Sequence, residues 1–207
     1  FYANPLAPPL CIKIYALSED AVKAGLREIE GARLISTFHC GISGTEVGGG
    51  SGGGGGMYPP GIIHFEATGQ LPSGHIYIVM PYYTLSLADG ITKFLFPVRR
   101  GMPYQPLQSL ATGLADALAA IHLAGAAHCD LKPHNVLLND GTPVLIDLAA
   151  MTIFDEPPAE TTKGWVVTAS DEETSKLRSV ASVTLDLNCL ATTVYSAYLG
   201  DPSIYAL

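Results

Sequence analysis

The sequence predicts an α+β fold, with strands mostly in its first half and helices mostly in its second. Short segments rich in β-forming residues occur at residues 10–15, 62–66 and 76–80. Two longer segments, at residues 107–124 and 186–199, carry apolar residues at helical spacing. Strands that precede helices in this way are typical of the α+β class.

The composition is that of a globular chain. Its 207 residues suffice for one domain or two small lobes, and 48% of them are hydrophobic. The net charge of −8 argues against binding to nucleic acid or to an anionic membrane. The four cysteines form no CxxC pair, so neither a zinc site nor a disulfide framework is indicated. Without a membrane-length apolar run or a secretory signal, we expect an intracellular protein, cytoplasmic or nuclear.

A strand and a helix are expected first. Residues 10–15 are rich in β-formers, and Lys13 lies inside this strand. Ser18 is a suitable N-cap for a helix that runs to about residue 37. The residues expected on its buried side recur at helical spacing and are Val22, Leu26, Ile29 and Leu34.

A glycine-rich tract and a hairpin follow. Residues 48–56 are all glycine except for one serine. We interpret this tract as a flexible insert and not as a phosphate-binding loop, because no helix follows it. Residues 62–66 and 76–80 are predicted to pair around a loop at 68–74, which contains two glycines and a proline.

The second half is predicted to be mainly helical. A short helix is expected at residues 86–94 and a long one at 107–124, where Gly125 is suited to the C-terminal cap. Residues 150–180 are polar and are expected to form a long loop. A last helix is expected at 186–199, with one apolar side formed by Leu187, Leu190, Ala191, Val194 and Tyr198.

A polar cluster is expected around Asp130. Lys132 and Asn135 follow it closely, and Asp147 comes directly after the apolar residues 144–146. Two short strands with a polar loop between them would bring these side chains to one edge. Singly, each residue could serve structure alone, as a turn former or in an ion pair. Together they suit phosphoryl transfer, which needs a carboxylate for the hydroxyl, an amide and a carboxylate for metal, and a lysine for the phosphate.

Two motifs in this region resemble those of eukaryotic-type protein kinases. Residues 128–135 read His-Cys-Asp-Leu-Lys-Pro-His-Asn, which is similar to the catalytic loop HRDLKxxN of that family. Residues 147–149 read Asp-Leu-Ala and resemble the metal-binding DFG motif. The segment that begins at Asp186 resembles the DxWSxG start of a central helix.

The resemblance extends to the first half of the chain. Lys13 matches the strand lysine of the VAIK motif. Glu30 is the best match for the helix glutamate that pairs with this lysine, because the residues after it follow at the family's intervals, and Glu28 is the second candidate.

The resemblance implies ATP and Mg²⁺ as cofactors and a protein hydroxyl as the acceptor. Asp130 would orient this hydroxyl and accept its proton, while Lys132 would neutralise the transferring phosphate. Asn135 and Asp147 would hold magnesium. Lys13 would bind the α and β phosphates of ATP.

The same resemblance implies contacts to the adenine of ATP. Met80 would be the gatekeeper residue beside the base. The carbonyl oxygen of Pro81 would accept from the adenine amino group, and the backbone N–H of Tyr83 would donate to the ring. Cys11 would cover one face of the adenine and Leu137 the other.

By this resemblance the fold is bilobal and kinase-like, and incomplete at both ends. A small β-rich N-lobe with one helix would span residues 1–81, and a mostly helical C-lobe would span residues 82–207. The hinge would lie near residues 81–84. A lysine two places after the catalytic aspartate resembles the serine/threonine class of kinases.

Several positions differ from the family pattern and leave two alternatives open. No GxGxxG loop precedes Lys13, Cys129 replaces the arginine of HRD, and Ala149 replaces the glycine of DFG. These differences favour a pseudokinase or scaffold that binds a partner with or without nucleotide. The other alternative is a small-molecule kinase of the aminoglycoside or choline type, which shares an HxDxxxxN loop. Lys132 and the helix at Asp186 favour a protein substrate over that alternative.

Overall fold

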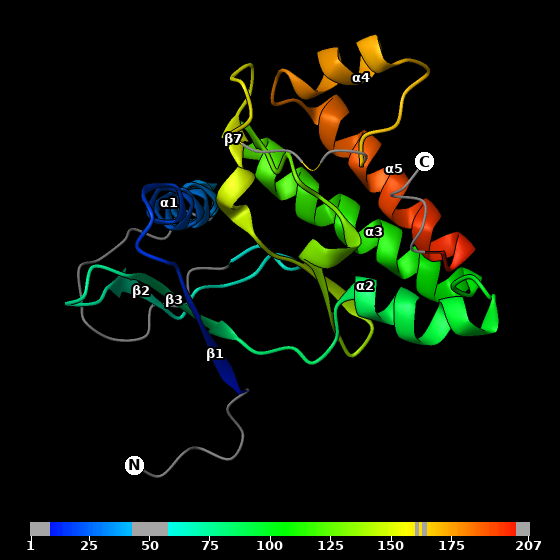
Figure 1. Cartoon of the computed structure of the whole chain (residues 1–207), viewed down its shortest axis with the longest axis horizontal. Coiled ribbons are helices and arrows are strands. Elements are labelled where there is room, and N and C mark those ends of the chain that lie inside the picture. Colours follow the sequence, from blue (N-terminus) through cyan, green and yellow to red (C-terminus); the bar gives the residue numbers. More distant parts are fainter. Residues whose placement is uncertain (1–8, 43–57, 160–161, 163–164, 202–207) are drawn as a thin grey trace.

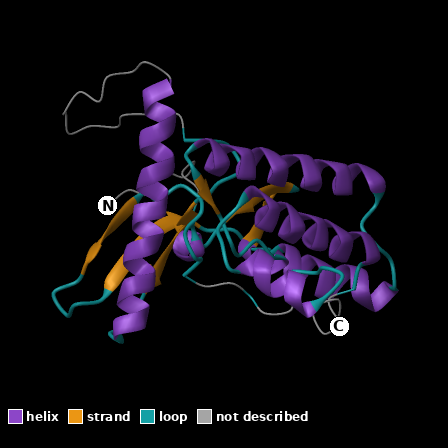
Figure 2. Cartoon of the chain, turned by 90° about the horizontal axis from the view of Figure 1, so that it is seen from above, coloured by secondary structure: helices purple, strands orange, loops and turns teal. Residues whose placement is uncertain are grey.

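The chain folds into a strand-rich part and a helical part, which lie side by side in Figure 1. The computed structural model describes residues 9–42, 58–159, 162 and 165–201, so the glycine-rich tract at 48–56 lies outside the described residues. The strand-rich part contains a three-stranded sheet and one long helix, which Figure 2 shows lying across the strands. The predicted α+β class is confirmed.

The sheet is antiparallel, with strand order β1-β3-β2. Its strands are β1 (Leu10–Ile14), β2 (Ala67–Gln70) and β3 (Ile76–Pro81). Side chains alternate between the two faces of a strand. Cys11 and Lys13 of β1 are therefore partly buried, while the residues between and beside them are exposed.

The predicted hairpin has a different first strand. The strand that pairs with β3 is Ala67–Gln70, and the expected strand at 62–66 reaches β3 at its last residue, where the N–H of Glu66 donates to the carbonyl of Val79 at 2.9 Å. Ile62 instead forms a single bridge to Leu145, and the N–H of Ile63 donates to the carbonyl of Leu145. Ile62 and Ile63 are both buried. A short apolar run is compatible with a strand or with a buried connection, and the sequence pattern alone cannot separate the two.

Helix α1 (Glu19–Ile42) begins where the sequence predicts and ends about five residues later than predicted. The hydroxyl of Ser18 accepts a hydrogen bond from the N–H of Ala21. The expected buried side is partly wrong, because Leu26 is 52% exposed. Gly31 faces the segment that follows Asp147, and a Cβ there would lie 3.3 Å from the carbonyl oxygen of Leu148. The absence of a side chain thus lets α1 lie close to this segment.

The helical part is built around α3, whose inner side is completely buried at Leu114, Leu118 and Ile121. The short helix expected at 86–94 is present as α2 and the π-helical turn after it. The elements of this part are α2 (Leu87–Gly90), π-helix Ile91–Leu95, 3₁₀-helix Phe96–Val98, α3 (Tyr104–Leu123), β4 (Ala126–Ala127), 3₁₀-helix Pro133–Asn135, β5 (Val136–Asn139), β6 (Thr142–Leu145), 3₁₀-helix Leu148–Ala150, β7 (Thr152–Ile153), α4 (Asp171–Arg178) and α5 (Val183–Leu199). Among the described residues, no helix is both long enough and apolar enough to cross a membrane.

The buried side of α5 is not the apolar side that the sequence predicts. Leu187 and Tyr198 are 51% and 56% exposed. The buried residues are mostly small or polar, namely Leu185, Asp186, Cys189, Thr192, Thr193, Ser196 and Ala197. Small side chains allow α5 to pack closely against α3, and a buried carboxylate must face its hydrogen-bond donors. These two requirements outweigh the free energy that burying Leu187 would contribute.

The region predicted as a long loop contains helix α4. Its N-cap Ser170 accepts from the N–H of Glu173, the first turn is acidic, and the last turn carries Lys176 and Arg178. Acidic residues near a helix N-terminus and basic residues near its C-terminus are stabilised by the helix dipole. This order of charges is the sequence signal that could have predicted the helix. No apolar pattern predicted it, because α4 has no buried residues.

We expect Gly101→Ala to destabilise the protein. A Cβ at Gly101 would overlap the carbonyl oxygen of Tyr198 at the end of α5, and backbone atoms cannot move aside as a flexible side chain can. Overpacking of this kind costs about 1–3 kcal/mol of unfolding free energy, measured by denaturant titration. Gly90→Ala is the matched control, since its nearest neighbour would be 3.9 Å away. Equal stability of both variants would contradict the packing described.

Candidate active site

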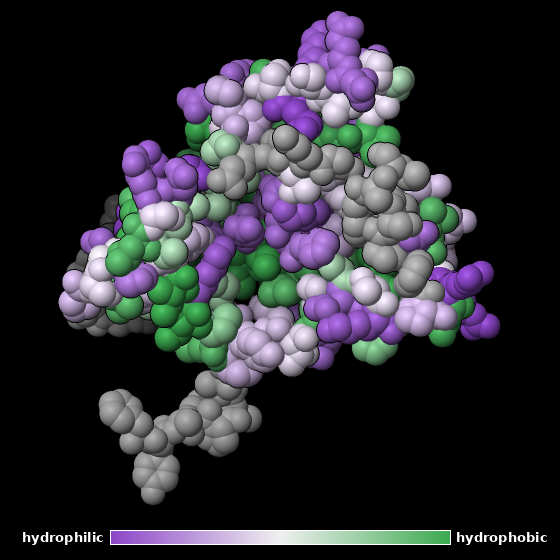
Figure 3. Space-filling view, viewed as in Figure 1, coloured by the Kyte–Doolittle hydropathy of each residue, from purple (hydrophilic) through white to green (hydrophobic). Residues whose placement is uncertain are grey.

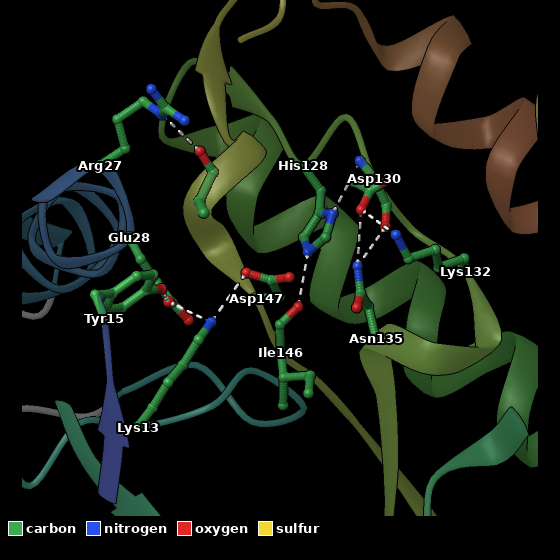
Figure 4. Close-up of polar contacts among 11 residues, drawn as sticks. Lys13, Tyr15, Arg27, Glu28, His128, Asp130, Lys132, Asn135, Ile146 and Asp147 are labelled. Atoms are coloured by element: carbon green, nitrogen blue, oxygen red, sulfur yellow. Dashed lines mark hydrogen bonds and ion pairs between the residues drawn. The ribbon is translucent and has the colours of Figure 1, made fainter. Parts of the chain in front are cut away.

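Lys13 joins the strand-rich part to the segment that follows β6. Its Nζ lies 2.8 Å from Oε2 of Glu28 on α1 and 3.3 Å from Oδ1 of Asp147, as Figure 4 shows. The Glu28 side chain is 2% exposed, whereas the side chains of Lys13 and Asp147 are each 37% exposed. The ammonium group is therefore paired on its buried side and accessible to solvent on the other.

The surroundings of Lys13 keep it charged. Burial alone would lower the pKa of Lys13, but the negative charges of Glu28 and Asp147 outweigh it and raise the pKa above its ordinary value. A permanently charged ammonium group at this position can bind an anion at any physiological pH.

The prediction that Glu30 pairs with Lys13 is wrong. The second candidate, Glu28, is the glutamate that contacts Lys13. Glu30 is exposed on the far side of α1 and lies 3.9 Å from Arg33. Residues two apart on an α-helix point in very different directions, so only one of these glutamates can face the sheet. Ile29, Ala32 and Ile35 are buried and set the rotation of α1 that turns Glu28 inward.

Asp130 is the centre of a second polar cluster. Lys132 Nζ lies 2.6 Å from Asp130 Oδ2, and Asn135 Nδ2 donates to the same oxygen at 3.1 Å and to the Asp130 carbonyl at 2.9 Å. Figure 4 shows the three side chains converging. The amide oxygen of Asn135 takes part in none of these bonds. The structure thus brings Asp130, Lys132 and Asn135 together, as the sequence predicts.

Thr162 belongs to this cluster, and sequence reasoning missed it. Its N–H and its hydroxyl both donate to Asp130 Oδ1, at 3.0 and 2.5 Å, and its hydroxyl accepts from Lys132 Nζ at 2.6 Å. The contact joins residues 32 positions apart in the chain. No local pattern marks one threonine within a long polar segment, so only the tertiary structure reveals it.

A buried carboxylate holds the backbone of this loop in place. Asp186 of α5 is 0% exposed and accepts from the N–H groups of His128 and Cys129, at 2.8 and 2.9 Å. His122 Nε2 lies 2.8 Å from the same carboxylate. Cys129 has a φ of +66° and Asp147 a φ of +63°, a region that residues other than glycine rarely adopt. Such conformations persist where neighbouring contacts enforce them, and they are frequent at functional sites.

Two hydrogen bonds connect the two polar clusters. The N–H of Ile146 donates to the carbonyl of Asn135 at 2.9 Å, and His128 Nε2 donates to the carbonyl of Ile146 at 3.1 Å. Asp147, the next residue, is therefore held in a fixed relation to Asp130. In the space-filling view of Figure 3, hydrophilic residues gather between the part that contains α1 and the helical part.

The residues predicted to contact adenine also lie together. Met80 is buried in a cluster against which Cys11, Tyr83 and Leu137 pack. Cys11 is opposite Met80 in the sheet, and its Sγ lies 3.8 Å from the carbonyl oxygen of Pro81. This cluster borders the Lys13 strand and β5, so an apolar wall adjoins the charged groups.

Comparison with protein families now identifies the fold. The family model described as "Protein kinase domain" matches residues 57–202. The chain belongs to the protein kinase family. The similar proteins described next are all named serine/threonine-protein kinases.

Two bacterial kinases illustrate the similarity. Serine/threonine-protein kinase AfsK of Streptomyces coelicolor is 35% identical over 182 residues, which are 86% of this chain and 19% of AfsK. Serine/threonine-protein kinase PknK of Mycobacterium tuberculosis is 36% identical over 97 residues, which are 45% of this chain and 8% of PknK. A plant relative, RUNKEL of Arabidopsis thaliana, is 28% identical over 153 residues, which are 71% of this chain and 11% of RUNKEL. The part that aligns with this chain therefore spans less than a fifth of the length of each of these relatives.

The donor groups of the site fit ATP and magnesium, which protein kinases generally use. Magnesium prefers oxygen ligands and is usually held by one or two carboxylates together with substrate phosphates. Asp147 supplies a carboxylate oxygen and Asn135 an amide oxygen, and Lys13 supplies a positive charge. Among the described residues no group of three or more His, Cys, Asp or Glu side chains forms a metal site.

We expect Asp186→Asn to lower stability as well as activity. The amide nitrogen of asparagine would face either His122 or a backbone N–H, leaving a buried donor without an acceptor. The cost is about 1–3 kcal/mol of unfolding free energy, measured by denaturant titration. Asp116→Asn, on the exposed side of α3, is the control. A variant as stable as wild type would show that the carboxylate is not required.

The thiol of Cys129 is expected to be unreactive in the folded kinase. Burial and then the charge of Asp186 raise its pKa to about 12. Because the thiolate is the reactive form, the native protein at about pH 8 should be alkylated by iodoacetamide at the partly exposed Cys11 and not at Cys129. Mass spectrometry of the digested protein gives the site, and alkylation in denaturant is the control. Rapid labelling of Cys129 in the native state would contradict its burial.

Proposed function

We propose that this chain is the catalytic part of an ATP-dependent serine/threonine protein kinase, which transfers the γ-phosphate to a hydroxyl of a protein. The observation that carries the proposal is the pair of linked clusters, one around Asp130 and one around Lys13 and Asp147. In the first cluster the carboxylate of Asp130 can accept a hydrogen bond from a hydroxyl. In the second the ammonium group of Lys13 can bind a phosphate.

In this proposal Asp130 acts on the acceptor hydroxyl. Its Oδ1 already accepts from the hydroxyl of Thr162, which indicates that this oxygen can accept from a hydroxyl group. Asp130 would orient the substrate hydroxyl and accept its proton. Lys132 contacts both Asp130 and Thr162, so its ammonium group would neutralise charge on the transferred phosphate at the same place.

Lys13 and Asp147 would hold the phosphate end of the nucleotide. A lysine ammonium group has three donors, of which Glu28 and Asp147 use two. The third would bind the α and β phosphates. Asn135 and Asp147 would hold Mg²⁺, which when bound would offset the negative charge of the phosphates.

The adenine would lie against the apolar cluster of the strand-rich part. Met80 would be beside the base, Cys11 and Leu137 on its two faces, and Pro81 and Tyr83 would bond to its edge through their backbones. The clustering of Cys11, Met80, Tyr83 and Leu137 supports this arrangement. Residues 82–85 lie between β3 and α2 and are neither helix nor strand, which supports an N-lobe to residue 81, a C-lobe from 82, and a hinge at 81–84.

The acceptor in this proposal is a protein in an intracellular compartment. The relatives described above are all named serine/threonine-protein kinases, which does not favour the scaffold or the small-molecule alternative. The net charge of −8 supports a partner other than nucleic acid.

Asp130→Asn is the direct test of the catalytic step. It keeps the side-chain shape and removes the base, so phosphate transfer from labelled ATP to a generic protein acceptor should fall by about 100-fold or more. The exposed Asp116→Asn should behave like wild type. Supplying choline and an aminoglycoside beside the protein acceptor tests the substrate class. Equal transfer by wild type and Asp130→Asn, or transfer to the small molecules alone, would overturn the proposal.

A further inference from the structure

Tyr15 contacts the buried ion pair of the nucleotide site. We propose that its hydroxyl is a positioning group, which holds the carboxylate of Glu28 in the orientation that pairs with Lys13. The role of this pair in binding ATP rests on the proposed function. The contact between Tyr15 and Glu28 itself is a property of the structure and can be tested without ATP.

The ring of Tyr15 is held from several sides. The residue directly follows β1 and is 9% exposed. Its N–H donates to the carbonyl of Ile76 at 2.9 Å, which fixes its backbone to the end of β3. Its hydroxyl donates to Oε2 of Glu28, the same oxygen that Lys13 contacts. Figure 4 shows Tyr15 and Lys13 reaching Glu28 together.

Gly25 provides the space for this ring on α1. A Cβ at Gly25 would lie 2.7 and 2.9 Å from two ring carbons of Tyr15, closer than side-chain carbons approach. Glycine inside a helix is destabilising relative to alanine. The helix thus has a residue of low helix propensity at the position where Tyr15 packs, three residues before Glu28. The glycine at this position therefore supports the proposal that the ring of Tyr15 has to lie here.

The charges explain why Glu28 needs a second partner. Glu28 is 1% exposed, and a buried carboxylate without hydrogen bonds is strongly unfavourable. Lys13 is shared with Asp147 and, in the proposed function, with phosphate. When phosphate oxygens attract the ammonium group, the hydroxyl of Tyr15 still satisfies Glu28. The ring lies 5.0 Å from Lys13 Nζ, so Tyr15 contacts both members of the pair.

The hydroxyl of Tyr15 remains a donor under physiological conditions. Burial, and then the charge of Glu28, raise its pKa above the ordinary value for tyrosine. A neutral donor beside a carboxylate avoids a second charge in this buried place. Phenylalanine would preserve the ring and its packing on Gly25 and would remove only the hydrogen bond.

The experiment compares Tyr15→Phe with wild type in two backgrounds. In the wild-type background we expect the KM for ATP to rise about tenfold, which corresponds to the loss of one hydrogen bond to a charged group. In a Glu28→Gln background, Tyr15→Phe should add little, because the partner charge is already gone. Tyr77→Phe is the matched control, a tyrosine on β3 that pairs with Ile14 and Gly69 and not with Glu28.

A second measurement uses the protein without nucleotide. Lys13 loses part of its pairing when Glu28 is released, so its amine should react faster with an amine-specific ester in Tyr15→Phe, mapped by mass spectrometry. This acceleration should disappear in the Glu28→Gln background. A role of Tyr15 in packing alone would not produce that dependence on Glu28.

The outcomes separate the two proposals. Unchanged labelling of Lys13 in Tyr15→Phe, or the same acceleration with and without Glu28, overturns the positioning role even if the kinase transfers phosphate. Accelerated labelling that depends on Glu28 supports the role even if wild type transfers no phosphate, and in that case the proposed function fails alone. The positioning role is also overturned if Tyr15→Phe leaves the KM for ATP at the wild-type value while Lys13→Ala raises it.

Discussion

The burial of the Asp186 carboxylate is the constraint on which the catalytic region depends. A fully buried charge is tolerated only when donors surround it, and here two backbone N–H groups and His122 supply the hydrogen bonds. The requirement fixes three elements at once, α3, α5 and the loop that carries Asp130. It also explains why α5 buries small and polar residues and exposes Leu187. Asp130 is thus positioned by a side chain 56 residues away.

The strand-rich part is attached to this framework mainly through α1. Gly31 allows the helix to lie close to the backbone of Leu148, and Arg27 Nε donates to the carbonyl of Ala149 at 3.1 Å. Glu28 on the same helix pairs with Lys13, which in turn contacts Asp147. A movement of α1 would therefore disturb the segment that contains Asp147 and the position of Lys13 together. Tyr15 stabilises this arrangement from the sheet side.

Much of the site was predictable because its residues are close in sequence. Asp130, Lys132 and Asn135 belong to one loop, and two apolar strands of four residues hold Asp147 beside them. The choice between Glu28 and Glu30 was not predictable from spacing, since it depends on how the buried residues of α1 orient the helix. The contact of Thr162 with Asp130 was equally hidden, because the interacting residues are far apart in the chain and the polar segment around Thr162 has no periodic pattern.

By itself the sequence determined the fold class, the family resemblance and the order of the polar residues in the candidate site, since these follow from local patterns of residue type and spacing. The tertiary structure alone decided which glutamate faces Lys13, which strand pairs with β3, which side of α5 is buried, and that Thr162 lies on Asp130. Each of these depends on contacts between distant segments, where the burial of charges and close packing outweigh local preference.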